Sequence, residues 1–356
     1  MSEILKGIEL VKKLSLAFGP TGCEGEVREA ILSQINDLGA EIKTDKMGNM
    51  CALVKGSLPS DEKKLIMISA HMDEVGFMVN HIDGEGYINL VNVGGIDDRV
   101  IAGKRIIIKN ERGEKYNGVI CIKAIHHRSS DERSNVIPLS KMYATLGCNS
   151  KEEAEALIDT ADFAVFDSEF VVFGENGEFV KSKALDDRMG CAAMIEIMRK
   201  WNEEGYIPRH DVLFAFTVRE ETGLSGAGVV AHRYAPDYSI VLECTAVADL
   251  PNVPAHKRVG KLGDGGAVSL VDRSTIYPEE MISLAMNTAE KYKIKAQIKK
   301  YVSGGNDAGH IHKSGKGVKT LAISVPTRYL HSAACVASYH DYEAVRDLAE
   351  KIITEI

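Results

Sequence analysis

The sequence predicts an α/β fold built on a mixed, largely parallel sheet flanked by helices, with a small β-rich domain inserted into it. Three observations support this prediction. Apolar runs bounded by polar residues recur along the chain, as expected of strands buried on both faces of a sheet. Segments with helical spacing of apolar residues lie between these runs. One long stretch instead alternates short β-like runs with glycine turns. The buried-type runs cover residues 65–70, 211–218, 237–242 and 318–325.

The first part of the chain predicts two helices and a strand pair. Apolar residues recur at helical spacing over residues 4–16, and a Gly-Pro-Thr-Gly turn ends that helix. A second helix is predicted for residues 26–38. Strands are predicted for residues 41–44 and 50–54, joined across a polar turn.

The chain changes character between residues 74 and 181, where glycine turns separate short alternating runs. This pattern predicts a small β-barrel or sandwich. Its adjacent histidines, His126 and His127, lie in a charged segment that we interpret as a solvated loop and do not count as ligands. Predicted strands cover residues 77–80, 87–93, 105–109, 118–125, 163–166 and 170–173, and a helix is predicted for 152–160.

The remaining sequence returns to α/β character, so we expect one domain formed by residues 1–73 and 182–356, interrupted by an inserted domain of residues 74–181. A Gly-Gly loop at 303–309 suggests a phosphate cradle, but the Gly-Lys-Ser/Thr ending of a P-loop is missing, and nucleotide binding is not predicted. Helices are predicted from Asp186 towards residue 201 and for 227–233, 278–292 and 341–356, and strands for 268–271 and 295–301.

The composition is typical of a globular protein and limits the possible partners. The chain has 356 residues, and its formal net charge of −8 provides no basic footprint for nucleic acid or anionic membranes. No apolar run approaches the ~20 residues of a membrane span, and the first residues lack the apolar core of a signal peptide, so a cytoplasmic protein is expected. The seven cysteines are scattered without a C-x-x-C pair. Any metal must therefore be held by histidines and carboxylates.

Two strand ends carry polar residues suited to metal chemistry. Glu220 and Glu221 follow the run at 211–218, and adjacent side chains there point in roughly opposite directions. One carboxylate can bind a cation while its neighbour faces a bound water. His71 and Asp73 end the run at 65–70, and Asp73 is placed to orient the His71 imidazole. The alternatives are two solvated glutamates on a loop and a core histidine beside a salt-bridging aspartate.

Further polar residues occupy equivalent places at the predicted sheet edge. Parallel strand ends converge there, so these side chains can meet although they are distant in sequence. Asp186 begins a helix, where ordinary capping explains one aspartate of its Asp-Asp pair better than two. With Glu220 left free, two histidines and three carboxylates suit Zn²⁺, Co²⁺ or Mn²⁺. Five ligands are too many for one catalytic zinc and fit two cations that share a carboxylate. The ligand set is His71, Asp186, Glu221, Glu243 and His331.

At these residues the sequence resembles the dinuclear-metal aminopeptidases that assemble as tetrahedral particles. That family includes glutamyl, leucyl and deblocking aminopeptidases, and members once labelled cellulases. The resemblance covers the whole chain in order and implies a sheet of the metallo-exopeptidase type with an inserted small β-barrel domain. It is carried by the runs ISAHMDEVGFMV, KALDDRMGCA, TVREETGLSGA, GGNDAG and VPTRYLHS.

The resemblance also implies a role for each site residue. Asp186 bridges the two metals, and a strained peptide bond follows it. His71 and Glu243 complete one site, with Asp73 behind His71. Glu221 and His331 complete the other site. Glu220 is the general base that takes a proton from the bridging water and returns it to the leaving amine.

The sequence thus predicts a metal-dependent aminopeptidase that acts on short peptides through a hydroxide bound by two divalent metals. The inserted domain is expected to pair subunits, and the pairs to build a homo-oligomer of twelve. Alternatives are a related metallo-deacylase or carboxypeptidase, a metal-stabilised scaffold without activity, and a glycosidase, which would leave both histidines unused.

One position departs from the family. Relatives commonly carry aspartate where this chain has Glu243, and glutamate reaches further from the strand by one methylene. We expect the strand to be set back to suit the longer side chain. If Glu243 is not a ligand, the nearby Asp249 is the candidate to test.

Overall fold

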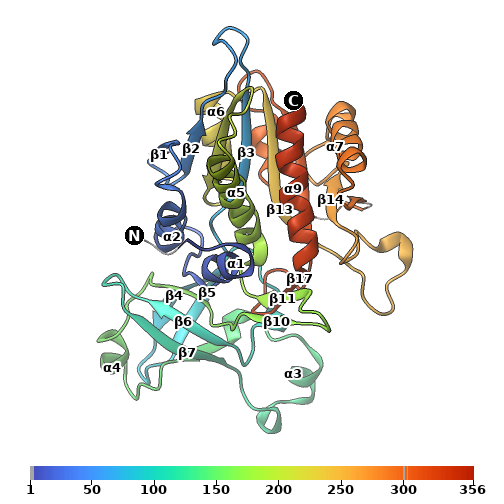
Figure 1. Cartoon of the computed structure of the whole chain (residues 1–356). Helices are drawn as coiled ribbons and strands as arrows, with labels where there is room; N and C mark the ends of the chain where they lie inside the picture. Colours follow the sequence, from blue (N-terminus) through green and yellow to red (C-terminus); the bar gives the residue numbers. More distant parts are fainter. Residues whose placement is uncertain (1–3, 300, 303) are drawn as a thin grey trace.

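The computed structural model describes residues 4–299, 301–302 and 304–356, and within them an 11-stranded mixed sheet lies beside a closed β-barrel (Figure 1). The predicted fold class is confirmed. The barrel packs against one end of the α/β part, at the bottom of Figure 1. Positions 300 and 303, which belong to the predicted strand at 295–301 and the loop at 303–309, lie outside the described residues.

The large sheet is parallel at its centre and antiparallel towards its edges. Strands β12, β3, β13 and β16 run parallel, so their carboxyl ends lie at one edge of the sheet. This edge faces the barrel. The strands in sheet order are β1 (Glu41–Thr44), β2 (Met50–Val54), β12 (Asp211–Thr217), β3 (Leu65–His71), β13 (Tyr238–Ala246), β16 (Lys319–Arg328), β17 (Cys335–Ser338), β11 (Phe179–Ser182) and β10 (Val171–Phe173), with β14 (Gly266–Ser269) and β15 (Ala296–Lys299) attached at β16.

Helices cover both faces of this sheet, which explains its nearly continuous apolar strands. In β12, Phe214 and Phe216 pack into one core and Leu213 and Ala215 into the other. The first core lies under α1 (Gly7–Leu16), α2 (Gly25–Ile35), α5 (Leu185–Glu204), α7 (Glu279–Tyr292) and α9 (Tyr339–Glu355). The second lies under α6 (Ser225–Tyr234) and α8 (Ala308–Ile311).

The barrel has a separate hydrophobic core. Phe77 and Phe166 meet edge to face at its centre, with ring centroids 5.2 Å apart. Its strands are β4 (Gly76–Ile82), β5 (Ile88–Val93), β8 (Tyr143–Thr145), β7 (Lys115–Cys121), β6 (Arg105–Lys109) and β9 (Phe163–Phe166), and the short helices α3 (Ser130–Ser134) and α4 (Lys151–Glu155) lie in its loops. Single 3-10 turns occur at Asp98–Val100, Ile125–His127, Leu139–Lys141 and Ala255–Lys257.

The structure differs from the sequence prediction at several short strands. β10 lies within the predicted insertion of residues 74–181 and β11 crosses its end at residue 181, but both strands belong to the large sheet, which β11 joins by pairing with β17. The last barrel strand, β9, already ends at Phe166. β8 and β17 were not predicted, because strands of three or four residues carry too few apolar positions to show a period. The strand predicted for 237–242 continues to Ala246, so Glu243 lies inside it.

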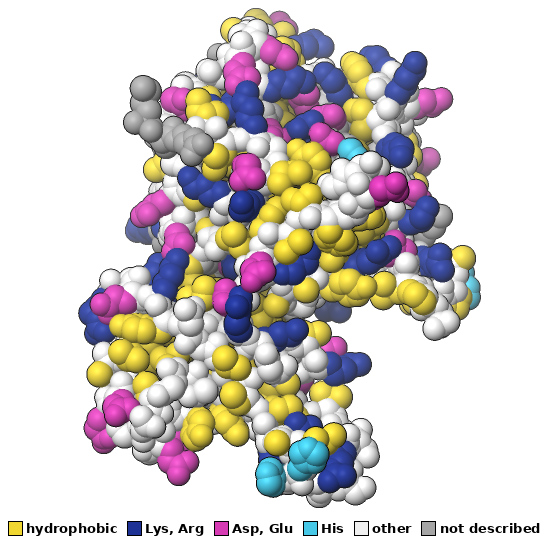
Figure 2. All heavy atoms as spheres, turned by 60° about the horizontal axis from the view of Figure 1, so that its bottom comes forward, with side chains coloured by type: hydrophobic (Ala, Val, Ile, Leu, Met, Phe, Trp, Pro, Cys, Tyr) yellow, Lys and Arg dark blue, Asp and Glu magenta, His cyan; other side chains and the backbone are white. Residues whose placement is uncertain are grey.

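The surface carries charges of both signs, and the described helices are not of the membrane-spanning kind. On the face shown in Figure 2, acidic and basic side chains are interspersed, and hydrophobic side chains gather in a band across its middle. None of the helices in the described residues is both long and apolar enough to cross a membrane.

Candidate metal centre

The polar side chains predicted from the strand ends meet at the sheet edge that faces the barrel. The chain reaches this edge after each central parallel strand, and α5 begins there. The residues are His71 at the end of β3, Asp186 at the start of α5, Glu220 and Glu221 after β12, Glu243 within β13 and His331 after β16.

The first group, which we call the inner subsite, consists of His71, Asp186 and Glu243. The Nε2 atom of His71 lies 3.3 Å from Asp186 Oδ1 and 3.4 Å from Glu243 Oε1. All three residues are buried, and one ligand atom from each lies within 4.8 Å of the others. The predicted first set is therefore assembled in one place.

The second group, the outer subsite, consists of Asp186, Glu221 and His331. The Nε2 atom of His331 lies 3.3 Å from Glu221 Oε2 and 3.6 Å from Asp186 Oδ2. Asp186 thus presents one carboxylate oxygen to each histidine. The His331 side chain is 34% exposed, whereas that of His71 is 2% exposed.

These distances suit divalent cations. Metal–ligand bonds of about 2.0–2.1 Å at tetrahedral angles place two ligand atoms about 3.3 Å apart. Asp186 Oδ1 and Glu243 Oε2 are buried, and neither has a hydrogen-bond partner among the described residues. A buried carboxylate oxygen without a partner costs free energy unless a cation satisfies it. The residues therefore fit two cations that share Asp186.

Both imidazoles are oriented for metal binding by backbone carbonyls. His71 Nδ1 donates to the carbonyl of Asp73 at 3.0 Å, and His331 Nδ1 donates to the carbonyl of Gly95 at 2.7 Å. A carbonyl can only accept, so the proton of each neutral ring lies on Nδ1. The Nε2 lone pairs then point at the carboxylates, as in metal-ligating histidines.

Asp73 lies beside His71 as predicted, but its carboxylate has a wider set of partners. Its Oδ1 is 3.6 Å from His71 Nδ1, while the closer contact is made by its backbone carbonyl. The carboxylate accepts hydrogen bonds from the Thr21 hydroxyl at 2.6 Å and from the backbone amides of Glu220 and Glu221 at 3.1 and 3.2 Å. Asp73 therefore holds the end of β3 and the glutamate turn together.

Glu220 lies close to the ligands but outside the closest pairs of either subsite. A carboxylate oxygen of Glu220 is within 4.8 Å of ligand atoms of His71 and Glu221. Arg219, just before it, has a left-handed backbone with φ 59°, which turns the chain at the strand end. Burial, opposed by His71 and reinforced by Glu221, raises the pKa of Glu220 well above its usual range.

The charges of the centre are tightly balanced in the protein alone. Burial would lower the pKa of His331, but Asp186 and Glu221 outweigh it and raise this pKa to about 9. Burial raises the pKa of Glu221 to about 7, against the lowering effect of His331. Burial would also lower the pKa of His71, but Glu243 and Asp186 raise it well above its usual range. Protons are thus drawn to atoms where a bound cation would replace them.

The Asp186-Asp187 pair has two separate roles. The peptide bond between these residues is cis, at the position where the family resemblance implied an unusual bond. Asp187 is fully buried and accepts a hydrogen bond from the Gly190 amide at 3.1 Å, so it caps α5. A Cβ at Gly190 would lie 2.5 Å from Asp187 Oδ2, which explains the glycine. Capping thus accounts for Asp187, while Asp186 faces the histidines.

Two buried groups near the centre were missed by the sequence interpretation. Asp307, from the Gly-Gly loop, accepts a hydrogen bond from the Thr217 hydroxyl at 2.7 Å, and burial raises its pKa to about 6. Cys244 lies beside Asp186 and Asp187, but burial raises the pKa of its thiol well above the usual range. We therefore do not count Cys244 as a ligand. Neither residue has a local sequence signal, because only the fold brings Asp307 beside Thr217 of β12 and places Cys244 of β13 beside the two aspartates.

The alternative ligand Asp249 is already engaged. Its two carboxylate oxygens contact Arg328 Nε and Nη2 at 2.7 and 2.8 Å, and one of them also accepts from the Leu262 amide. Glu243, rather than Asp249, lies with His71 and Asp186. His312, which follows α8, is not part of the centre, because its Nδ1 donates to the Ala308 carbonyl at 2.7 Å.

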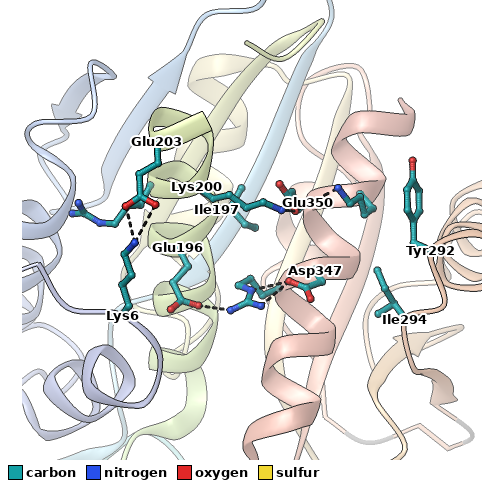
Figure 3. Close-up of a pocket in the computed structure, with 12 residues that line it drawn as sticks. Lys6, Glu196, Ile197, Lys200, Glu203, Tyr292, Ile294, Asp347 and Glu350 are labelled. Atoms are coloured by element: carbon teal, nitrogen blue, oxygen red, sulfur yellow. Dashed lines mark hydrogen bonds and ion pairs between the residues drawn. The ribbon is translucent and has the colours of Figure 1, made fainter. Parts of the chain in front are cut away.

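Two hollows differ in their chemistry. A groove of about 480 Å³ lies between α5 and α9, on the part of α5 remote from Asp186 (Figure 3). Its charged side chains already pair with one another, as Lys6 does with Glu203 and Arg346 with Glu196. A much smaller hollow is lined by Asp186, Glu221 and His331. Because Asp186, which has an unpartnered buried carboxylate oxygen, lines the smaller hollow, we place the functional site there.

Known proteins match this chain over most of its length. A family model described as M42 glutamyl aminopeptidase matches residues 48–348. A putative aminopeptidase of Acetivibrio thermocellus is 36% identical over 97% of this chain and 98% of its own length.

Solved structures agree with the sequence comparison. The TET aminopeptidase of a marine sediment thaumarchaeote is 33% identical and covers 98% of this chain and 96% of its own, with a TM-score of 0.93. The TET1 peptidase of Pyrococcus horikoshii, which can assemble into a tetrahedron or a large octahedral shell, is 35% identical with a TM-score of 0.85. The match to the Pyrococcus horikoshii chain covers 98% of this chain and 99% of that chain.

Proposed function

Because the chain belongs to the M42 glutamyl aminopeptidase family and is therefore a peptide hydrolase, we propose that it removes amino-terminal residues from short peptides at a centre of two divalent cations, with Glu220 as general base. The observation that carries this proposal is Asp186, whose two carboxylate oxygens face His71 and His331 separately. Zn²⁺, Co²⁺ or Mn²⁺ fits the mixed nitrogen and oxygen donors.

The residues of the centre divide the work. When bound, the two cations would lower the pKa of a shared water and polarise the scissile carbonyl. His71 and Glu243 would hold the inner cation, Glu221 and His331 would hold the outer one, and Asp186 would contribute to both. Glu220 takes a proton from the attacking water and transfers it to the leaving amine, a role that suits a carboxylate whose pKa burial raises well above its usual range.

The free amine of the substrate explains why an aminopeptidase fits better than the related amide hydrolases. The family model and the matching relative carry aminopeptidase descriptions, and aminopeptidases act on substrates with a free amino terminus. A metallo-deacylase or carboxypeptidase would act on substrates whose amine is blocked or remote. The substrate panel described below distinguishes these activities.

We also propose that the chain forms a cytoplasmic homo-oligomer, with twelve subunits built from dimers. The relative from Pyrococcus horikoshii assembles into closed shells. Here β10 is the terminal strand of the large sheet, and its Val171, Val172 and Phe173 side chains are 39%, 43% and 41% exposed. This edge lies within residues 74–181, to which we assign subunit pairing. An apolar unpaired edge favours burial against another chain.

The experiment is metal removal with a matched substrate panel. Dialysis against a chelator should abolish hydrolysis of aminoacyl arylamides, and Zn²⁺, Co²⁺ or Mn²⁺ should restore it, with bound metal approaching two per chain. The same arylamides with an acetylated amine, and peptides with a blocked amino terminus, serve as controls and should not be cleaved. Full activity in the metal-free protein would exclude the mechanism, and preference for the acetylated compounds would assign a deacylase instead.

A further inference from the structure

The barrel is connected to the α/β part next to two of the three residues of the inner subsite, His71 and Asp186. The chain enters β4 directly after His71 and Asp73, and it returns through β11 just before Asp186. Glu74 at the entry and Lys183 at the exit are both buried, and Lys183 Nζ lies 2.6 and 2.9 Å from the two carboxylate oxygens of Glu74. Arg188 Nη2 adds a contact to Glu74 at 3.3 Å. This buried cluster ties the two connections of the barrel together.

A barrel loop also reaches the outer subsite. Gly94 and Gly95 follow β5, and the Gly95 carbonyl accepts the hydrogen bond from His331 Nδ1 at 2.7 Å. Gly94 has φ +83°, and a Cβ there would lie 2.8 Å from Val75 Cγ1 and 3.4 Å from the Glu221 Cβ. The loop therefore contacts His331 through the Gly95 carbonyl, and a side chain at position 94 would crowd Val75 and the Glu221 Cβ.

His331 depends on this contact more than His71 depends on its own. His71 is the last residue of a central strand, and its carbonyl partner is two residues away in the same chain segment. His331 lies beyond the end of β16, has a left-handed backbone with φ 57°, and is one-third exposed. Among the hydrogen bonds of the described residues, the bond to Gly95 is the one that holds its Nδ1.

We infer that the Gly94–Gly95 loop of the barrel is a positioning element of the outer subsite, so that the barrel determines how tightly the second cation is held. The inference rests on the proposed dinuclear centre and deepens it. The partner of a ligating imidazole fixes its tautomer and direction, and loss of such a partner typically costs about 10–100-fold in metal affinity. The barrel therefore acts on metal loading at the outer subsite.

The test replaces Gly94 with alanine, and the control replaces Gly86, a glycine near the other end of β5. Gly86 precedes β5 as Gly94 follows it; it has φ +82°, and a Cβ there would lie 2.8 Å from the Ser150 carbonyl oxygen. Gly86→Ala thus strains the barrel to a comparable degree at the end of β5 away from His331. Zn²⁺ alone is titrated into each metal-free protein against a chromophoric chelator, and Co²⁺ absorption reports the ligand geometry.

We expect wild type and Gly86→Ala to bind two Zn²⁺ per chain with the same affinities. Gly94→Ala should bind the first ion as wild type does and the second about 10–100-fold more weakly. The inference is overturned if Gly94→Ala holds both ions as tightly as wild type, or if Gly86→Ala loses the second ion to the same extent. Wild type that binds a single ion would instead contradict the dinuclear centre itself, and the inference with it.

A milder variant covers the case in which Gly94→Ala does not fold. Ile96 packs against the barrel core directly after the loop. Ile96→Ala shortens this anchor without introducing backbone strain, so the second Zn²⁺ should again bind more weakly while the first is unaffected. An unchanged second affinity in a folded Ile96→Ala protein would count against the inference.

Discussion

The inner and outer subsites use the same kinds of ligand but are built differently. The inner subsite lies among central strands, where His71 and Glu243 have side chains only 2% and 9% exposed. The outer subsite takes His331 from beyond a strand end, with its orienting carbonyl supplied by the barrel. Sites on rigid elements hold their geometry more precisely than sites on loops. Asp186, whose two carboxylate oxygens face His71 and His331, therefore connects a preorganised half to a half whose histidine is oriented by a barrel loop.

The two subsites also differ in how their ligands are satisfied when no cation is bound. Buried ligands must be satisfied completely, because an unpartnered charge in a core is costly. His331, whose side chain is one-third exposed, can be hydrated when no cation is bound. We therefore expect the inner cation to bind first and the outer cation to dissociate first during dialysis.

The largest effect is expected at the junction of the halves, for Glu220→Gln. Glutamine keeps the size of the side chain but cannot accept the proton, so kcat should fall about 10²–10⁴-fold with both metals retained. The neighbouring change Glu221→Gln is the matched control and should weaken the outer metal. Metal analysis and kinetics on both proteins decide between the roles. If Glu220→Gln loses metal and Glu221→Gln keeps it, the two assignments must be exchanged.

A smaller effect is expected inside the preorganised half, for Glu243→Asp. Glu243 lies within β13, which continues to Ala246. We expect the strand backbone there to be shaped around the longer glutamate side chain. Aspartate would leave the carboxylate short of the metal, and a displacement of about 1 Å can cost about 10²-fold in rate.

The control for this change is Asp249→Asn, because the Asp249 carboxylate forms an ion pair with Arg328 and, within the described residues, is not grouped with the ligands of the centre. It should leave the metal content unaltered, whereas Glu243→Asp should reduce occupancy of the inner subsite. Unchanged metal content and kcat in Glu243→Asp would argue that Glu243 is not a ligand.

The most gradual effect concerns pH and the outer subsite. The pKa of His331 is about 9 in the protein alone, so below pH 9 a proton must leave before a cation binds. Zn²⁺ affinity of the outer subsite should therefore fall about tenfold per pH unit as the pH decreases from about 9 to 7. Below pH 7 the Glu221 carboxyl, with a pKa of about 7, adds a second proton and steepens the decrease.

Competitive Zn²⁺ titrations at several pH values measure this slope. A His331→Ala protein, which retains only the inner subsite, supplies the slope of the other half for comparison. An outer-subsite affinity that does not change between pH 7 and 9 would contradict the proton linkage.

Much of the fold could be predicted because its signals are local. The central strands are buried on both faces, so their apolar runs are visible without knowledge of their neighbours, as in β3 and β12. Short strands such as β8 and β17 exist only because a partner strand is already in place. The same holds for β10 and β11, whose pairing with the large sheet differs from the predicted domain boundary at residue 181.

The sequence by itself determined the central strands, the separate core of the inserted domain, and the residue types gathered at the strand ends. Those features depend on side-chain chemistry at fixed spacing along the chain. Only the tertiary structure decided that Asp187 caps α5 while Asp186 faces both histidines, and that the Asp73 carboxylate binds the glutamate turn. It alone also decided that the Gly95 carbonyl orients His331, because every residue has a backbone carbonyl and only the fold determines which one lies beside an imidazole.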